Sequence, residues 1–346
     1  MIKEKDKHNG ETFYIYMLNI LACIAVISMH HNGKVHVFSN TLGWKQELVV
    51  EVVAYWAVPV FYMISGATLM NYRERYSTKV FLKKRFLKVG IPFIVWSALL
   101  LAKNIITGGY VLESPKGVKF VEGIINIRAQ NVYWFFPVIC GIYLIIPVLS
   151  LLKDNRKILW YIVMCIFVLT SVMPVICKWL HVQWYSGWKF PMDAAILYVV
   201  LGYLLSTENL NKKQRMVGYI LGIVGALIRY LYTYFTSISL NDVNRDLFVY
   251  EYFPAVWLAV AVFVFFKTCS WERVKNSRWK KYIINAASCS FGIYLIHIPV
   301  MEFEQNILHF SQNIWWRSVG IVFTYIISLT VVGIMKKIPI VKYIVP

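Results

Sequence analysis

Stretches of about 20 apolar residues, separated by short basic or polar segments, recur along the whole chain. Each is long enough to cross a bilayer core of about 30 Å as a helix, at about 1.5 Å per residue. A backbone in lipid must satisfy its own hydrogen bonds, so these segments are predicted to be helices and not strands. The pattern predicts an all-α polytopic membrane protein with about ten transmembrane helices, at residues 13–31, 48–71, 86–107, 132–152, 158–179, 190–206, 216–236, 249–267, 282–301 and 315–335.

The composition agrees with a membrane protein. Of 346 residues, 59% are hydrophobic and 15% are charged, whereas about 25% of the residues in a soluble domain are charged. This balance excludes a disordered chain and argues against a soluble globular enzyme. No linker or internal repeat divides the sequence, so we expect residues 1–346 to form a single integral membrane domain.

The distribution of basic residues predicts the orientation. The chain has 36 Lys and Arg against 17 Asp and Glu, a formal net charge of +19. Because the bases lie in short loops between apolar stretches, we expect them to face anionic lipid headgroups and not nucleic acid. Alternate loops carry most of the Lys and Arg, including the loop at 72–88. The positive-inside rule therefore predicts a multi-pass protein of the plasma membrane with both termini in the cytoplasm.

Four ionisable residues inside predicted spans are candidate functional residues, because a charge at membrane depth is costly. From the direction of each helix, His30, Glu51, Arg229 and His297 are expected in one layer of the outer leaflet. Two interpretations stay open: a functional cavity, or interfacial residues wetted by headgroups. Histidine suits proton transfer near neutral pH. The sequence has no metal-ligand motif, and we expect no metal site.

On the cytoplasmic side, the densest basic run is KVFLKKRFLKVGIP at 79–92. Within it Arg85 and Lys88 are three residues apart and so share one helix face. Cations in that place can hold phosphate groups. The simpler interpretation, favoured by composition alone, is a topology anchor.

Several motifs in series resemble the acyltransferase 3 family of polytopic membrane O-acyltransferases. The first span is similar to that family's Arg-x10-His helix, which places His30 on the family histidine and Asn19 where the family has arginine. The family's RxxR corresponds to Arg85 and Lys88. The remaining blocks are VPVFYMISGATL (58–69), FLKKRFLKVGIPFIVW (81–96), WFFPVICGIYLIIPVL (134–149), VVLGYLLS (199–206) and SCSFGIYLIHIPV (288–300).

The resemblance implies a membrane O-acyltransferase. It would move an acyl group, usually acetyl, from cytoplasmic acyl-CoA to a hydroxyl of an envelope or extracellular glycan or related acceptor. Acetyl-CoA would be the donor substrate. In this interpretation His30 is the general base on the acceptor hydroxyl, and Glu51 orients that histidine or balances its charge.

The resemblance also distributes the other candidates between donor and acceptor. Arg85, Lys88 and Asn19 would belong to the coenzyme A site, and His297 and Arg229 to the acceptor site. An alternative function, a transporter or exporter of a glycan or small molecule, fits the composition equally well. Against it, the sequence shows neither an inverted repeat nor a pair of broken helices in matching halves.

Overall fold

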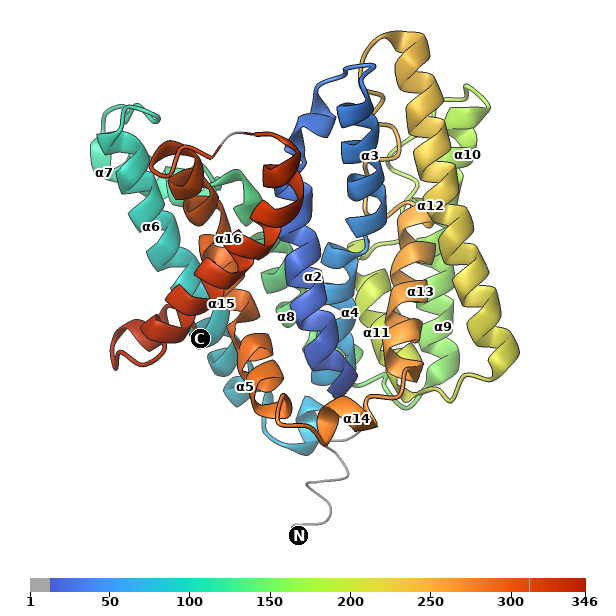
Figure 1. Ribbon diagram of the computed structural model, residues 1–346. Coiled ribbons are helices and arrows are strands. Elements are labelled where there is room, and N and C mark those ends of the chain that lie inside the picture. Colours follow the sequence, from blue (N-terminus) through green and yellow to red (C-terminus); the bar gives the residue numbers. More distant parts are fainter. Residues whose placement is uncertain (1–12, 311) are drawn as a thin grey trace.

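The computed structural model describes residues 13–310 and 312–346, and every regular element within them is a helix. The basic segment 1–12, with Lys3, Lys5 and Lys7 of the predicted cytoplasmic N-terminus, lies outside the described residues. The helices pack side by side as a bundle (Figure 1). Their bounds are α2 Phe13–His31, η1 Gly33–His36, α3 Leu42–Ala54, α4 Ala57–Leu69, η2 Tyr72–Glu74, α5 Thr78–Arg85, η3 Phe86–Gly90, α6 Ile91–Ile106, α7 Lys116–Ile125, η4 Asn131–Trp134, α8 Phe135–Leu149, α9 Arg156–Ile166, η5 Phe167–Val172, α10 Met173–Trp179, α11 Ala195–Thr207, α12 Lys212–Leu240, α13 Phe253–Thr268, α14 Glu272–Lys275, α15 Lys280–Asn306, α16 Ile314–Met335 and η6 Val341–Tyr343.

Each of the ten predicted spans has a helical counterpart in the same order. In the described part of the chain, eight helical segments are long and apolar enough to cross a membrane. The two remaining predicted positions are occupied by the shorter apolar helices α11 and α13. The expected all-α polytopic membrane fold is therefore confirmed. Below, "outer" and "cytoplasmic" refer to the sides that the basic loops predict.

The second predicted span is wrong in its start and in its continuity. Its helix begins earlier, at Leu42, where the Thr41 hydroxyl accepts a hydrogen bond of 3.3 Å from the Trp44 amide. Hydropathy missed this turn because it is polar. The helix is then interrupted at Tyr55 and Trp56, between α3 and α4. Pro59 has no amide hydrogen to donate to the Tyr55 carbonyl, so the α-helical pattern stops there.

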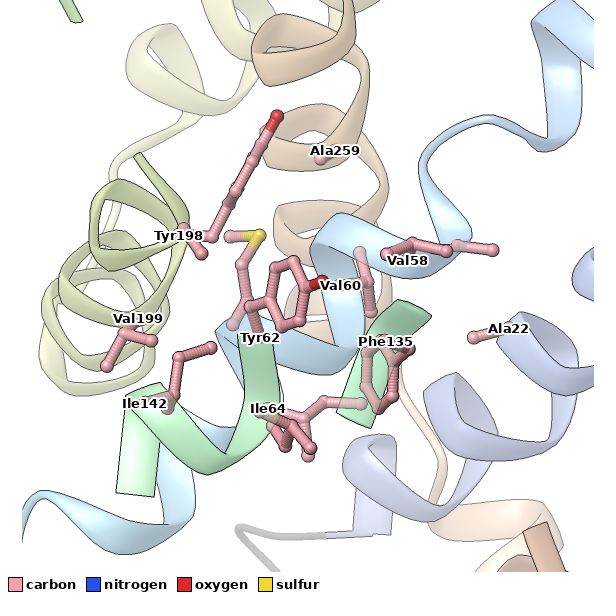
Figure 2. Packing of buried hydrophobic residues seen from close by; sticks show 14 of the residues in the cluster. Ala22, Val58, Val60, Tyr62, Ile64, Phe135, Ile142, Tyr198, Val199 and Ala259 are labelled. Carbon is pink, nitrogen blue, oxygen red and sulfur yellow. The ribbon is translucent and has the colours of Figure 1, made fainter. Parts of the chain in front are cut away.

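Two central helices, α4 and α11, pack backbone against backbone. A Cβ atom at Gly66 would lie 1.8 Å from the Val199 carbonyl oxygen, and one at Gly202 would lie 2.0 Å from the Met63 carbonyl oxygen. Small residues that allow such close approach are typical of helix pairs in membranes. Figure 2 shows side chains of α4, α8 and α11 packed around this crossing.

The outermost helices bury polar residues and expose apolar ones. On α12, Arg229 and Thr233 are buried, whereas Ile223, Leu227 and Leu231 are exposed. This distribution is the reverse of a soluble protein's and matches a surface that faces lipid. On the outer side, a short amphipathic helix, α7, covers the end of α6 (Figure 1).

Candidate active site

A cavity of about 350 Å³ lies inside the bundle. Its walls come from the helices α2, α3, α4, α5, α8 and α15, from the turns η1, η3 and η4, and from the loop before α13. Two of the seven residues singled out from the sequence, Arg229 and His297, lie behind its wall. Arg229 is next to Glu51 and His297 is next to His30, and both of these neighbours line the cavity. The five that line it are Asn19, His30, Glu51, Arg85 and Lys88.

Helix α2 supplies one continuous side of the cavity. Asn19, Val26 and His30 all line it, and their spacings of seven and four residues place them on one helix face. From Asn19 to His30 the helix rises about 16 Å at 1.5 Å per residue. The cavity therefore follows α2 for about three turns, from the cytoplasmic half of the protein to the outer half.

A widened helical turn presents the basic pair at the cytoplasmic end. Residues 86–90 form a π-helical turn, in which the Ile91 amide donates to the Phe86 carbonyl. Pro92 cannot donate to the Lys88 carbonyl, which prevents the regular α pattern here. Such π turns often occur at functional sites. Both Arg85 and Lys88 line the cavity as a result.

Arg85 is held by aromatic rings instead of carboxylates. Its guanidinium carbon lies 5.8 Å from the ring centroid of Phe81 and 5.7 Å from that of Tyr143. Its Nε is buried with no hydrogen-bond partner in the described part of the chain. A guanidinium positioned in this way can donate to an incoming anion. Asn19 lines the same end, and its amide nitrogen donates one hydrogen to the Ile15 carbonyl at 3.1 Å, which leaves its second N–H and its oxygen for other partners.

Two histidines meet toward the outer end. The rings of His30 and His297 have centroids 5.2 Å apart. His30 is half-buried and faces the cavity, whereas His297 is 1% exposed and lies behind it. The His297 Nδ1 donates to the Tyr294 carbonyl at 2.7 Å, because a carbonyl can only accept. The Nε2 atom therefore carries the lone pair, and it has no partner among the described residues.

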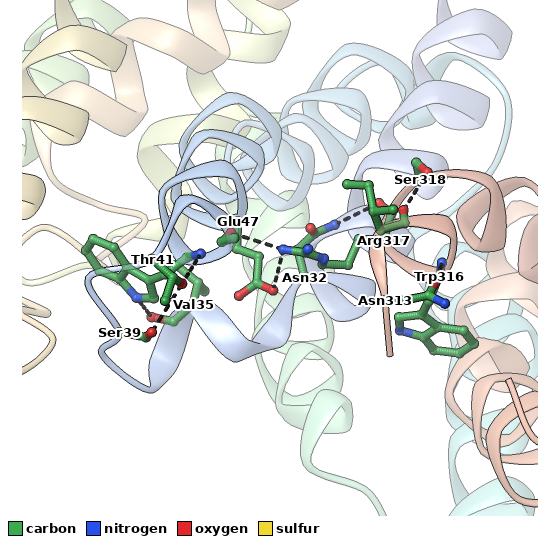
Figure 3. A network of polar contacts seen from close by, with 12 residues as sticks. Asn32, Val35, Ser39, Thr41, Glu47, Asn313, Trp316, Arg317 and Ser318 are labelled. Atoms are coloured by element: carbon green, nitrogen blue, oxygen red, sulfur yellow. Dashed lines mark hydrogen bonds and ion pairs between the residues drawn. The ribbon is translucent and has the colours of Figure 1, made fainter. Parts of the chain in front are cut away.

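The outer end of α2 is fixed by a polar network, of which Figure 3 shows the contacts of Asn32, Glu47 and Arg317. Arg317 of α16 donates to the Glu47 carboxylate at 3.1 Å, and Asn32 donates to the Arg317 carbonyl at 3.3 Å. His31 bonds to the Trp316 carbonyl and to the Thr324 hydroxyl, each at 2.9 Å. These contacts hold the turn that carries His30 against α3 and α16.

Glu51 and Arg229 form a buried ion pair at the outer end. Glu51 Oε1 and Arg229 Nη2 are 3.7 Å apart, with side-chain exposures of 7% and 2%. Glu51 lines the cavity and Arg229 does not. The Arg229 guanidinium carbon lies 3.1 Å from the ring centroid of Tyr55. The structure therefore places Arg229, expected to bind substrate, behind Glu51 as its counter-charge.

Sequence reasoning missed three lining residues at the outer end: His36, Trp134 and Tyr250. Desolvation by neighbouring side chains lowers the pKa of His36, and the charges of Arg245 and Arg229 lower it further. The His36 imidazole is therefore neutral at pH 7. No sequence pattern distinguished Trp134 or Tyr250 from the other aromatic residues, which make up 16% of the chain. The Trp134 signal was present only as the start of the resembled block 134–149.

Within residues 13–310 and 312–346, no three or more His, Cys, Asp or Glu side chains are grouped so that they could hold a metal ion. Among protein families, the one described as "Acyltransferase domain" matches residues 14–333 of the chain. No curated protein and no solved structure is significantly similar to it. The matched range contains every residue of the cavity wall named above.

Proposed function

Because the chain belongs to the acyltransferase 3 family of membrane acyltransferases, we propose that it is an O-acyltransferase. It moves an acyl group, most simply acetyl, from cytoplasmic acyl-CoA to a hydroxyl of an outward-facing glycan or related acceptor. One observation carries the proposal: a single cavity is lined by Arg85 and Lys88 at one end and by His30 at the other. A donor and an acceptor arriving from opposite sides of the membrane would meet inside it.

The cationic end suits the donor. Coenzyme A carries phosphates, and Arg85 and Lys88 offer two cations on the side predicted to be cytoplasmic. A cavity of about 350 Å³ is at the small end of known ligand sites, which span about 300–1,000 Å³. We infer that the acyl-pantetheine arm enters the cavity and that the nucleotide stays at its mouth, beside the basic pair.

The histidine end suits the chemistry. The neutral His30 imidazole takes the proton of the acceptor hydroxyl as its oxygen attacks the thioester carbonyl. A C–O bond forms, the C–S bond breaks, and the coenzyme A thiolate leaves and recovers the proton from His30. Glu51, paired with Arg229, balances the imidazolium that forms in the step. Positioned proton transfer of this kind contributes about 10²–10⁴-fold to a rate.

The test compares His30→Gln with His309→Gln, an exposed histidine outside the cavity. Acyl groups on envelope glycans are measured by mass spectrometry in cells that express each variant. Glutamine can bond to the hydroxyl but cannot take its proton, so His30→Gln should lose at least about 100-fold in transfer. His309→Gln should behave as the wild type.

Two outcomes would contradict the proposal in different ways. Near-normal acylation by His30→Gln would refute the general-base role. An absence of any acyl transfer by the wild type, combined with lost glycan or metabolite export when the protein is removed, would favour the transporter instead.

A further inference from the structure

The outer end of the cavity contains a stack of four flat groups. The Trp134 and Tyr250 rings have centroids 5.7 Å apart and planes inclined by 21°. Tyr250 and Tyr55 are stacked at 4.2 Å and 16°. On the far side of Tyr55 lies the Arg229 guanidinium, 3.1 Å from its centroid. Of these four groups, only the Trp134 and Tyr250 rings line the cavity. Glu51, the ion-pair partner of Arg229, also lines it.

The stack is held rigidly from four elements. Trp134 ends η4, which is fastened to α15 because the Tyr133 hydroxyl donates to the Leu295 carbonyl at 2.9 Å. The Tyr198 hydroxyl of α11 donates to the Tyr250 carbonyl. Arg229 belongs to α12, where it is 2% exposed. A platform assembled before ligand arrives costs little ordering entropy on binding.

The indole ring of Trp134 forms the cavity-lining end of this stack, and one side of the ring is not covered by the stack. Tyr250 covers one side of the ring, yet the residue remains 40% exposed and lines the cavity. An aromatic face is electron-rich and attracts weakly positive C–H groups laid flat against it. Elsewhere on the wall of the same cavity, the Glu51 carboxylate and the His36 imidazole can accept hydrogen bonds from hydroxyls. An apolar C–H face next to hydroxyl groups is the chemistry of a sugar ring.

We propose that Trp134 is the platform on which one sugar ring of the acceptor stacks, which places a hydroxyl of that ring toward His30. The inference rests on the proposed function and deepens it, because it commits the acceptor to a ring and excludes an acyclic polyol. The η4 turn links the platform to the histidines. The Tyr294 hydroxyl donates to the Val132 carbonyl, and the Tyr294 carbonyl accepts from His297.

Binding is tested separately from catalysis, on the full chain in lipid nanodiscs. The probes are methyl glycosides of glucose, galactose and N-acetylglucosamine, with sorbitol as the acyclic control, followed by saturation-transfer NMR. We expect at least one glycoside to bind with saturation concentrated on ring C–H protons, and sorbitol not to bind. Trp134→Leu should weaken that glycoside about tenfold or more, and Trp134→Phe by less, as for other aromatic stacking contacts.

The matched control is Trp315→Leu, since Trp315 is 69% exposed and does not line the cavity. Wild-type binding by Trp134→Leu, equal binding of sorbitol, or no binding of any glycoside to the wild type would each overturn the platform. Folding of each variant is checked by its melting temperature. Glycoside binding through Trp134 without acyl transfer would refute the transferase and leave the platform standing. Acyl transfer that is unaffected by Trp134→Leu would refute the platform and leave the transferase standing.

Discussion

Replacing Gly202 by alanine tests the packing that shapes one wall of the cavity. The added Cβ would lie 2.0 Å from the Met63 carbonyl oxygen of α4, whereas non-bonded atoms prefer about 3.5 Å or more. A backbone carbonyl cannot rotate away as a side chain can, so α4 and α11 must separate by roughly 1 Å or more. Overpacking of this kind costs typically about 1–3 kcal/mol. Alanine favours a helix over glycine by about 1 kcal/mol, which offsets only part of that cost.

The assay is thermal unfolding of the detergent-solubilised protein. Its readout is the fraction of the protein that stays monodisperse after heating. Gly218→Ala is the matched control, because Gly218 also lies within a helix, α12, and its Cβ would meet nothing within 4 Å. We expect Gly202→Ala to melt several degrees below the wild type and Gly218→Ala to melt at or above it. Gly66→Ala, at the same crossing, should resemble Gly202→Ala.

Equal melting temperatures for Gly202→Ala and Gly218→Ala would refute the close backbone contact between α4 and α11. A double variant, Gly66→Ala with Gly202→Ala, gives an independent check. Both changes are relieved by the same separation of the helices, so their costs should not add. Additive losses would mean that the two glycines lie in unconnected environments.

Three further predictions concern topology, the donor site and pH. In a background without the native cysteines, Gly117→Cys should react with an impermeant thiol reagent in intact cells and Thr78→Cys should not; equal labelling would refute the orientation. Arg85→Ala should weaken acetyl-CoA binding, measured by calorimetry, more than Arg85→Lys does, and the loss should shrink at high salt; unchanged binding would leave Arg85 as a topology anchor. Burial works to raise the pKa of the Asp246 carboxyl, but hydrogen bonds from Lys178, Asn244 and Tyr232 outweigh it and hold the pKa below its usual value. The stability that this carboxylate contributes is present above about pH 4 and is lost as pH falls through the lowered pKa, so acidification should lower the melting temperature of the wild type more than that of Asp246→Asn.

Hydropathy predicted the helices well because every residue that faces lipid is required to be apolar. It failed where a helix is surrounded by protein or extends beyond lipid. The turn at Leu42 is polar and packs its Trp44 inward, so its sequence does not look membrane-spanning. The break at Tyr55 and Trp56 has a local cause in Pro59, which the sequence did display.

The site was partly predictable for a different reason. Arg85 and Lys88 are three residues apart, so periodicity indicated that these two lie together. Asn19 was paired with His30 through the resemblance to the family's Arg-x10-His helix. What joins those two pairs in one cavity is tertiary packing. The position of Arg229 illustrates the limit. Its depth was inferred from helix direction, but whether it meets substrate or Glu51 depends on how α3 and α12 are rotated.

The short helix α11 has a consequence for hydrophobic mismatch. Every residue from Ala195 to Leu205 is buried, and at 1.5 Å per residue its 13 residues rise only about 20 Å, against about 30 Å for a bilayer core. Because protein and not lipid surrounds α11, the thickness of the bilayer does not act on it directly. The surrounding helices therefore shield the α4–α11 core from the bilayer. In the transfer proposed above, the distance between donor and acceptor would then be set by protein packing and is expected to stay the same in bilayers of different thickness.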